Sequence, residues 1–120
     1  MKILITSQSN QLTADVDPRF GRAKYFIIYD TETDKWEAVD NSKNLNAIQG
    51  AGIQASENAA STGAEYVLTG HCGPKAFKAL SANGIKIIIG VEGTVTSAVE
   101  RFKKGELKPS QQSDVSGHWA

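Results

Sequence analysis

The stretch 65–77, EYVLTGHCGPKAF, limits the possible folds more than any other part of the chain. A short apolar run, 66–69, is followed by glycine, and Pro74 then opens a helical pattern. A strand that ends at glycine before a helix with proline in its first turn predicts a βα turn. Such turns lie at the carboxyl edge of a sheet, where α/β proteins usually bind ligands. His71 and the chain's only cysteine, Cys72, fall in this turn, and they suit a metal-containing or anionic ligand.

The remaining patterns predict five strands and three helices in the order β-β-β-α-β-α-β-α. We expect strands at 2–6, 25–30, 35–39, 66–69 and 85–89, and helices at 48–62, 74–82 and 95–104. Right-handed crossovers and a hairpin between the second and third strands give a mixed five-stranded sheet of order 3-2-1-4-5. With helices on both faces, this predicts a ribonuclease H-like, three-layer α/β/α fold.

Length and charge restrict the class of protein. A chain of 120 residues fits one domain, which we expect over residues 1–105, followed by a flexible, mostly polar tail at 106–120. The chain has 13 basic residues (Lys and Arg) and 13 acidic residues (Asp and Glu), so its net charge is zero. It therefore has no strong basic field that would attract nucleic acid or an anionic membrane. No apolar run approaches the roughly 20 residues that cross a bilayer. A start that resembles a strand rather than a signal peptide, and a single cysteine, predict a cytoplasmic protein.

The predicted topology brings four connecting segments, 7–24, 40–49, 70–74 and 90–94, to one edge of the sheet. All three helices would begin at that edge, each with unpaired N–H groups and a partial positive charge. The expected cleft therefore attracts anions, and three acids in the same loops would weaken this if they pointed inward. Its candidate binding residues are Arg19, Arg22, Gly70, His71, Cys72, Gly73, Pro74, Gly90 and Gly93, with Lys75 nearby; the acids are Asp15, Asp17 and Glu92.

Three residues are candidate metal ligands: His71, Cys72 and, from the tail, His118. Each has a structural alternative: a backbone hydrogen bond for His71, a packed small hydrophobe for Cys72, and a disordered chain end for His118. Neighbours in an extended segment point to opposite sides, so His71 and Cys72 share a metal only if the turn bends sharply. The tail is long enough to return to the cleft. One cysteine and two histidines are too few for a closed zinc site, whereas an incoming cluster needing one or two protein ligands fits better.

Several motifs together resemble one known family over nearly the whole chain. They are DPRFGRAKYF at 17–26, the Asn-rich loop before the Gly-Ala-Gly of 50–52, the GHCGPKA turn at 70–76, and GIKI at 84–87. The family is the dinitrogenase iron–molybdenum cofactor biosynthesis group of NifX-type carriers and the NifB C-terminal domain. The resemblance implies a ribonuclease H-like fold without nuclease activity, and binding of an iron–sulfur precursor or finished cofactor that is then passed on. It would place the site around Arg22, 70–74 and the loop after Ile89.

We therefore expect a non-catalytic carrier of an anionic iron–sulfur cluster, with or without molybdenum, related to nitrogen fixation. Its partners would be cluster donor and acceptor proteins, and it would be a monomer or a weak homodimer. One alternative is a small regulatory module that binds a phosphorylated metabolite in the same cleft. The other is a metal-dependent nuclease, which needs clustered carboxylates on the central strands; the predicted strands 2–6 and 66–69 contain none.

Overall fold

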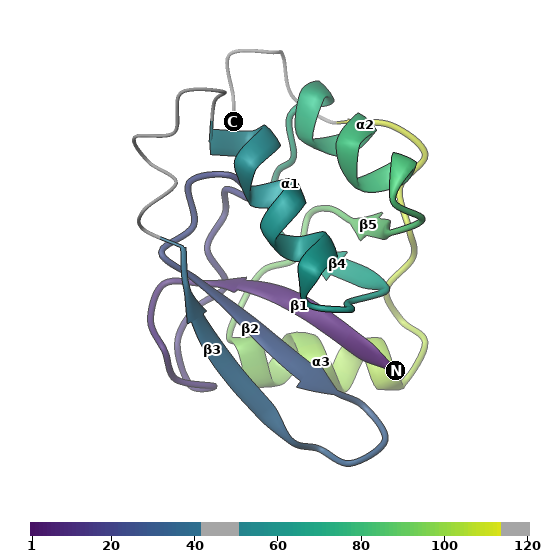
Figure 1. Cartoon of the computed structure of the whole chain (residues 1–120). Coiled ribbons are helices and arrows are strands. Elements are labelled where there is room, and N and C mark those ends of the chain that lie inside the picture. The colour runs from purple at the N-terminus through teal and green to yellow at the C-terminus, as the bar shows by residue number, and fades with distance from the viewer. Residues whose placement is uncertain (42–50, 114–120) are drawn as a thin grey trace.

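The computed structural model describes residues 1–41 and 51–113 and confirms the predicted order of elements (Figure 1). The sheet order is β3-β2-β1-β4-β5, as the sequence predicts. Most ends of the elements differ from the predicted ones by no more than one residue, and residues 48–50 of the first predicted helix lie outside the described ranges. The elements are β1 (Lys2–Ser7), β2 (Tyr25–Asp30), β3 (Trp36–Asp40), α1 (Ala51–Ser61), β4 (Tyr66–Leu68), α2 (Pro74–Ala82), β5 (Lys86–Ile88) and α3 (Val95–Lys103).

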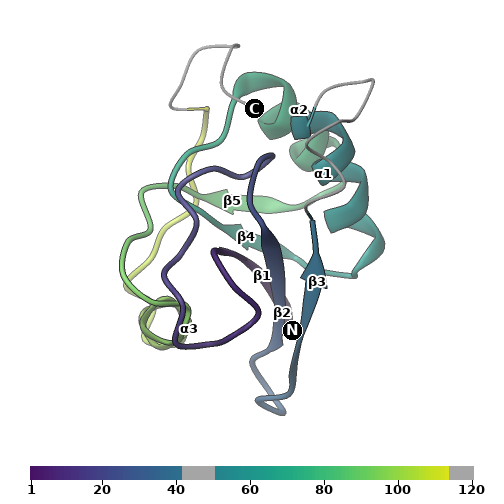
Figure 2. The same cartoon turned by 90° about the vertical axis from the view of Figure 1, so that its left-hand side faces the viewer.

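The central strand β1 organises the sheet. It pairs antiparallel with β2 and parallel with β4, and β4 pairs parallel with β5. Its residues 3–7 are all buried, as expected for a strand covered on both faces. Helices α1 and α2 cover one face of the sheet and α3 covers the other (Figures 1 and 2). Each face has its own buried cluster of apolar side chains, so the fold has three layers.

The apolar patterns of the helices explain how they pack. Val95, Ala98 and Val99 of α3 follow the i, i+3, i+4 spacing and are buried on one stripe. The inner face of α1 carries the small, fully buried Ala55 and Ala59, which let this helix lie close to the sheet. None of the helices in the described part of the chain is long and apolar enough to cross a membrane.

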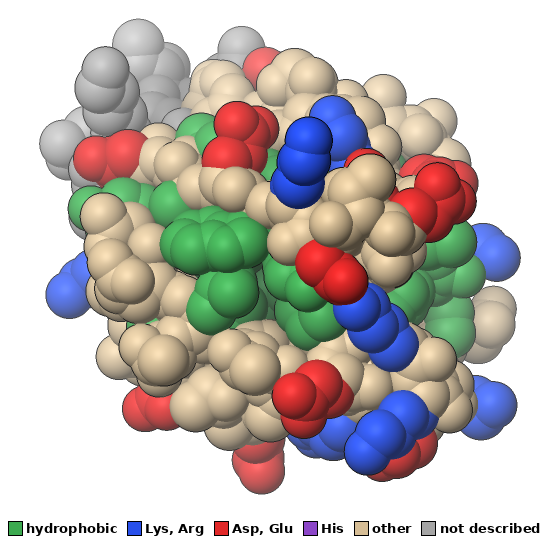
Figure 3. Space-filling model, turned by 90° about the horizontal axis from the view of Figure 1, so that it is seen from below, with side chains coloured by type: hydrophobic (Ala, Val, Ile, Leu, Met, Phe, Trp, Pro, Cys, Tyr) green, Lys and Arg blue, Asp and Glu red, His purple; other side chains and the backbone are tan. Residues whose placement is uncertain are grey.

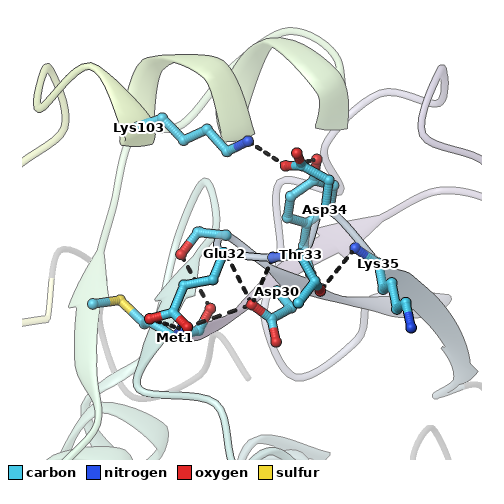
Figure 4. A network of polar contacts seen from close by, with 9 residues as sticks. Met1, Asp30, Glu32, Thr33, Asp34, Lys35 and Lys103 are labelled. Atoms are coloured by element: carbon cyan, nitrogen blue, oxygen red, sulfur yellow. Dashed lines mark hydrogen bonds and ion pairs between the residues drawn. The ribbon is translucent and has the colours of Figure 1, made fainter.

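A group of polar contacts ties the β2–β3 hairpin to α3 (Figure 4), which lies on the face of the sheet away from α1 and α2 (Figure 1). The carboxylate of Asp34 accepts hydrogen bonds from the Tyr29 hydroxyl, at 2.8 Å, and from the Lys103 ammonium group. Lys103 also lies over the Tyr29 ring, 5.4 Å from its centroid. Seen from below, acidic and basic side chains are interspersed on the surface (Figure 3), so this face carries no field of one sign.

The Asp34 contacts predict a pH dependence of stability. The hydrogen bonds from Lys103 and Tyr29 lower the pKa of Asp34 below its ordinary value of 3.8. A carboxyl group whose pKa is lower in the folded state stabilises that state above about pH 4, and the contribution is lost as the pH falls through the lowered pKa. We expect Asp34→Asn to lower the urea midpoint at neutral pH and to reduce its fall between neutral pH and about pH 3.

Glu32→Gln is the matched control, because Glu32 lies in the same turn and only its exposed ion pair with the amino terminus, at 3.4 Å, is lost. That variant should keep the pH dependence of the parent protein. Equal loss of pH dependence in both variants would show that the Asp34 contacts are not its source.

Candidate functional site

Loops meet at the edge where β1, β4 and β5 end, and we call residues 7–24, 69–74 and 89–94 the carboxyl rim. The segment between β1 and β2 passes α3 and then the ends of β4 and β5 (Figure 2). Isolated β-bridges confirm this path, since Asp15 pairs with Thr94 and Arg19 with His71. Three of the four predicted segments therefore converge, and the fourth, 40–49, lies almost wholly outside the described residues.

The first half of the long rim segment covers the N-terminus of α3. Val95 N donates to Ala14 O at 2.9 Å, and Thr96 N donates to Leu12 O at 3.0 Å. The next amide, Ser97 N, donates to the Thr94 hydroxyl at 3.1 Å. The expectation that all three helix N-termini offer free donors is therefore wrong for α3, because the chain's own carbonyl and hydroxyl groups already occupy them.

The second half of the segment is fixed by Asp17. Its buried carboxylate accepts hydrogen bonds from Arg19 N, at 3.1 Å, and Lys24 N, at 3.4 Å. Its carbonyl accepts a bond of 2.7 Å from the Thr6 hydroxyl, which lies 2.9 Å from that of Thr69. Asp17 is therefore a positioning residue that closes the turn with its own carboxylate. The sequence signal for this role covers only the bond from Arg19 N, since an Asp that accepts from the amide two residues on is a common turn pattern.

Apolar anchors hold the same turn against the core, while its two arginines face solvent. Phe20 and Ala23 are fully buried, and the Phe20 ring stacks on Phe26 with centroids 5.5 Å apart. Arg19 and Arg22 are both exposed. The turn therefore alternates between anchoring and charged positions.

Asn41 completes the support of this turn from the end of β3. Its side-chain amide donates to Ala23 O at 2.8 Å and to Gly21 O at 3.4 Å, and its backbone amide donates to Lys24 O at 2.8 Å. The Asn-rich composition of this loop is visible in the sequence, but the role of this particular residue is not.

Gly70 allows the rim segments to touch. A Cβ atom at this position would lie 2.8 Å from both the Cα and the carbonyl oxygen of Pro18, closer than such atoms can approach. Beside this contact, Phe20 N donates to His71 O at 3.2 Å. The close approach brings Arg19 next to His71, which is half-buried.

Cys72 lies in the packed interior rather than at the surface of the rim. Its relative exposure is 0%, and it belongs to the same buried cluster as Phe20 and Ala76. A ligand role for the Cys72 thiol, which stays a prediction, would require the turn 70–74 to open. The described residues contain no group of three or more His, Cys, Asp or Glu side chains able to hold a metal ion, and His118 lies outside them.

Helix α2 presents a more open N-terminus than α3. It begins at the exposed Pro74, and its N-cap residue, the buried Gly73, has no side chain that could occupy the amides of the first turn. Lys75, in the first turn, is exposed. Among the helix starts that the structure describes completely, α2 is thus the one suited to an anion, and it directly follows His71 and Cys72.

The last part of the rim is the turn after β5. Gly90 N donates to Gly70 O at 2.9 Å, which joins the two βα turns. Gly93 has a φ of 88°, a conformation that favours glycine, and its carbonyl accepts a hydrogen bond of 2.9 Å from Val16 N. Both glycines are exposed, so the predicted binding positions of this turn do lie at the rim.

The family described as dinitrogenase iron-molybdenum cofactor matches residues 1–105. The apo form of the orange protein from Desulfovibrio gigas is 43% identical, with a TM-score of 0.92 over 95% of this chain and 96% of that one. A NifB-like protein from Thermotoga is 34% identical, with a TM-score of 0.82 over 95% of this chain and 97% of that one. An uncharacterised protein of Methanocaldococcus jannaschii is 25% identical over 111 residues, 90% of each chain.

The family match covers most of the chain, and two of the relatives exceed 30% identity over almost their full length. The motifs that the family resemblance rests on, 17–26 and 70–76, are the segments that the structure brings together at the rim. This chain therefore belongs to the dinitrogenase iron–molybdenum cofactor family.

Proposed function

We propose that this protein is a non-catalytic carrier that binds an anionic metal–sulfur cluster, or its precursor, at the carboxyl rim and passes it on. Iron and sulfide, with or without molybdenum, are the cargo that family membership supports. The observation that carries the proposal for this chain is the contact between the two family motifs, which sets the exposed Arg19 beside His71. The cargo is delivered by a donor protein and received by an acceptor protein.

The rim groups suit a cargo whose sulfides carry negative charge. Arg19 and Arg22 supply guanidinium donors, and the start of α2 supplies backbone amides. Each charge-assisted hydrogen bond contributes about 1.5–3 kcal/mol, so four to six of them support micromolar binding once association costs are subtracted. Such binding is weak enough for release to an acceptor. The remaining binding positions are the backbone of 70–74 together with Gly90 and Gly93.

Three side chains are proposed as ligands of the cargo's metal atoms. His71 is half-buried at the rim and next to Arg19, so its imidazole needs the least movement. Cys72 would ligate only after the turn 70–74 opens, because its thiol is buried in this structure. His118 would act from the tail.

The proposal predicts a specific loss of binding when rim charge is removed. The purified protein is reconstituted anaerobically with iron and sulfide, and binding is followed by visible absorption and by metal and sulfide analysis. We expect Arg19→Ala and Arg22→Ala each to weaken binding by about tenfold or more, because each variant lacks a charge-assisted hydrogen bond. Lys35→Ala, which removes an exposed cation from the distant β2–β3 hairpin, is the matched control. Equal affinity in all three variants would contradict a site at the rim.

A second set of variants separates the proposed ligands. The double variant carries both His71→Ala and Cys72→Ala. If the absorption bands are lost in the double variant but kept in Cys72→Ala alone, His71 is the ligand. Loss in Cys72→Ala with an unchanged fold would show that the turn opens to admit the cargo. Unchanged binding and absorption in the double variant would reject both ligands.

The alternatives can be tested on the same protein. A phosphorylated metabolite would use the same arginines and the same helix start, so inorganic phosphate at millimolar concentration should then compete with the cargo. The nuclease alternative predicts magnesium-dependent cleavage of RNA or DNA hybrids, which an assay on the purified protein tests directly. Of the rim carboxylates, that of Asp17 is buried and already accepts hydrogen bonds from two backbone amides.

A further inference from the structure

Strand β5 is an edge strand of the sheet, and some of its backbone N–H and C=O groups point away from β4. Lys86 N donates to Glu65 O, and Ile88 O accepts from Thr69 N, so these two residues direct their backbone groups toward β4. In a parallel pair the direction alternates along the strand, so Ile87 and Ile89 direct theirs to the open side. An edge of this kind can pair with a further strand.

Residues 106–111, which we call the strap, cross this edge but pair with it only weakly. After Gly105 ends α3, Leu107 packs against the apolar cluster on the α3 face. Ser110 N then donates to Ile87 O at 2.7 Å. In the described part of the chain this is the one backbone hydrogen bond between strap and β5, and Pro109 has no N–H to add another. The Ile87 and Ile89 amides receive no acceptor from the strap.

A groove of about 550 Å³ lies between the strap, β5 and α2. Phe77, Ile85 and Pro109 give it apolar walls, and Lys108 gives it positive charge. Lys86 also lines the groove, but its ammonium group lies over the Tyr66 ring, 5.8 Å from the centroid, at the face of β5 that α3 covers. No acidic side chain lines the groove among the described residues. It therefore suits an extended segment that has an apolar side chain and a carboxylate, and the combination of edge groups with a side-chain pocket is that of strand addition.

We propose that the open edge of β5 is the docking site for an acidic, extended segment of a partner protein, which displaces the strap and adds a sixth strand to the sheet. The segment's backbone pairs with Ile87 and Ile89, one of its apolar side chains enters the groove, and one of its carboxylates approaches Lys108. Since Gly90 follows β5 directly and bonds to Gly70, the docked partner would sit beside the carboxyl rim. The inference does not rest on the proposed cargo.

The test uses a probe of stated chemistry and the full-length protein without cargo. A capped nine-residue peptide of alternating valine and glutamate is titrated into isotope-labelled protein, and backbone amide shifts are recorded. We expect shifts concentrated at 85–89 and 106–111. Matched probes are the same peptide with lysine in place of glutamate, and the acidic peptide with alternate peptide nitrogens methylated. Both should bind more weakly, because the first reverses the charge and the second lacks the pairing N–H groups.

Ser110→Pro gives the sharper prediction, because it removes the one strap amide that bonds to β5 while leaving β5 intact. Release of that single hydrogen bond should raise affinity for the acidic peptide by about two- to tenfold. Ser110→Ala keeps the backbone amide and should bind like the parent protein. Arg19→Ala, which belongs to the proposed cargo site, should also leave peptide affinity unchanged, so failure of one proposal is distinguishable from failure of the other.

Three results would overturn this inference. The first is the absence of shifts at 85–89 in Ser110→Pro with millimolar acidic peptide. The second is equal affinity for the acidic and the lysine-containing peptide. The third is self-association of Ser110→Pro at micromolar concentration in sedimentation experiments without added peptide, which would make a second copy of this chain the occupant of the edge.

Discussion

Replacing Phe20 with alanine is expected to destabilise the protein by about 3–5 kcal/mol, the usual range for a fully buried phenylalanine. The ring has no exposed surface, stacks on Phe26 and packs in the same cluster as Cys72. It also anchors the turn from which Arg19 and Arg22 project. We therefore expect the amide signals of 17–24 and 70–73 to change together, and urea denaturation to show the loss of stability.

Phe102→Ala is the matched control for that variant. Phe102 is a half-buried aromatic on α3, with its ring centroid 4.9 Å from that of Tyr66, far in the fold from the anchored turn. The Phe102→Ala variant should lose less stability than Phe20→Ala, and the amide signals of 17–24 and 70–73 should stay unchanged. If Phe20→Ala fails to fold, Phe20→Leu provides a smaller change with the same expected direction. Rim signals that stay unchanged in a folded Phe20 variant would show that another residue anchors the turn.

Gly70→Ala is the second substitution with a large expected effect. The added methyl group would overlap backbone atoms of Pro18, which cannot move aside as a flexible side chain could. Overpacking of this kind costs typically 1–3 kcal/mol and occasionally more, and we expect the upper part of that range. Because the Pro18 contact sets Arg19 beside His71, we also expect weaker cargo binding. Thermal unfolding and the reconstitution experiment measure the two effects.

Gly84→Ala controls for the loss of a glycine with a left-handed backbone. Gly84 lies between α2 and β5, outside the rim, and has a φ of 74° but open space around its Cα atom, so the alanine variant carries only the strain of a left-handed conformation, about 1–2 kcal/mol. Its cargo affinity should stay close to that of the parent. Similar losses of affinity in both variants would mean that the Pro18 contact has no special part in arranging the site.

The arrangement of the sheet was predictable because its signals are local. Residues 66–69 and 85–89 read as buried strands, and the spacing of Val95, Ala98 and Val99 reads as one helix face. Crossover handedness then leaves few possible strand orders, and the observed order is the predicted one. The turn at 70–74 was predictable for the same reason, since glycine and proline act on their own backbone.

The parts that could not be predicted depend on contacts between distant segments. Cys72 has the sequence context of an exposed turn, but it is buried in one apolar cluster with residues from distant parts of the chain, among them Phe20. The start of α3 reads as an open helix N-terminus, but the carbonyl groups of Leu12 and Ala14 occupy its amides. Nothing in the residues around either position signals these partners.

In the turn 17–24, the residues that fix the backbone are different from the residues that face solvent, and this affects how the family can diversify. Asp17, Phe20 and Ala23 hold the backbone, whereas the side chains of Arg19 and Arg22 are exposed to solvent. Exchange of these two exposed side chains should therefore cost the fold little stability, and a descendant protein can acquire a preference for a larger, smaller or less charged guest by exchanging surface groups on an unaltered scaffold.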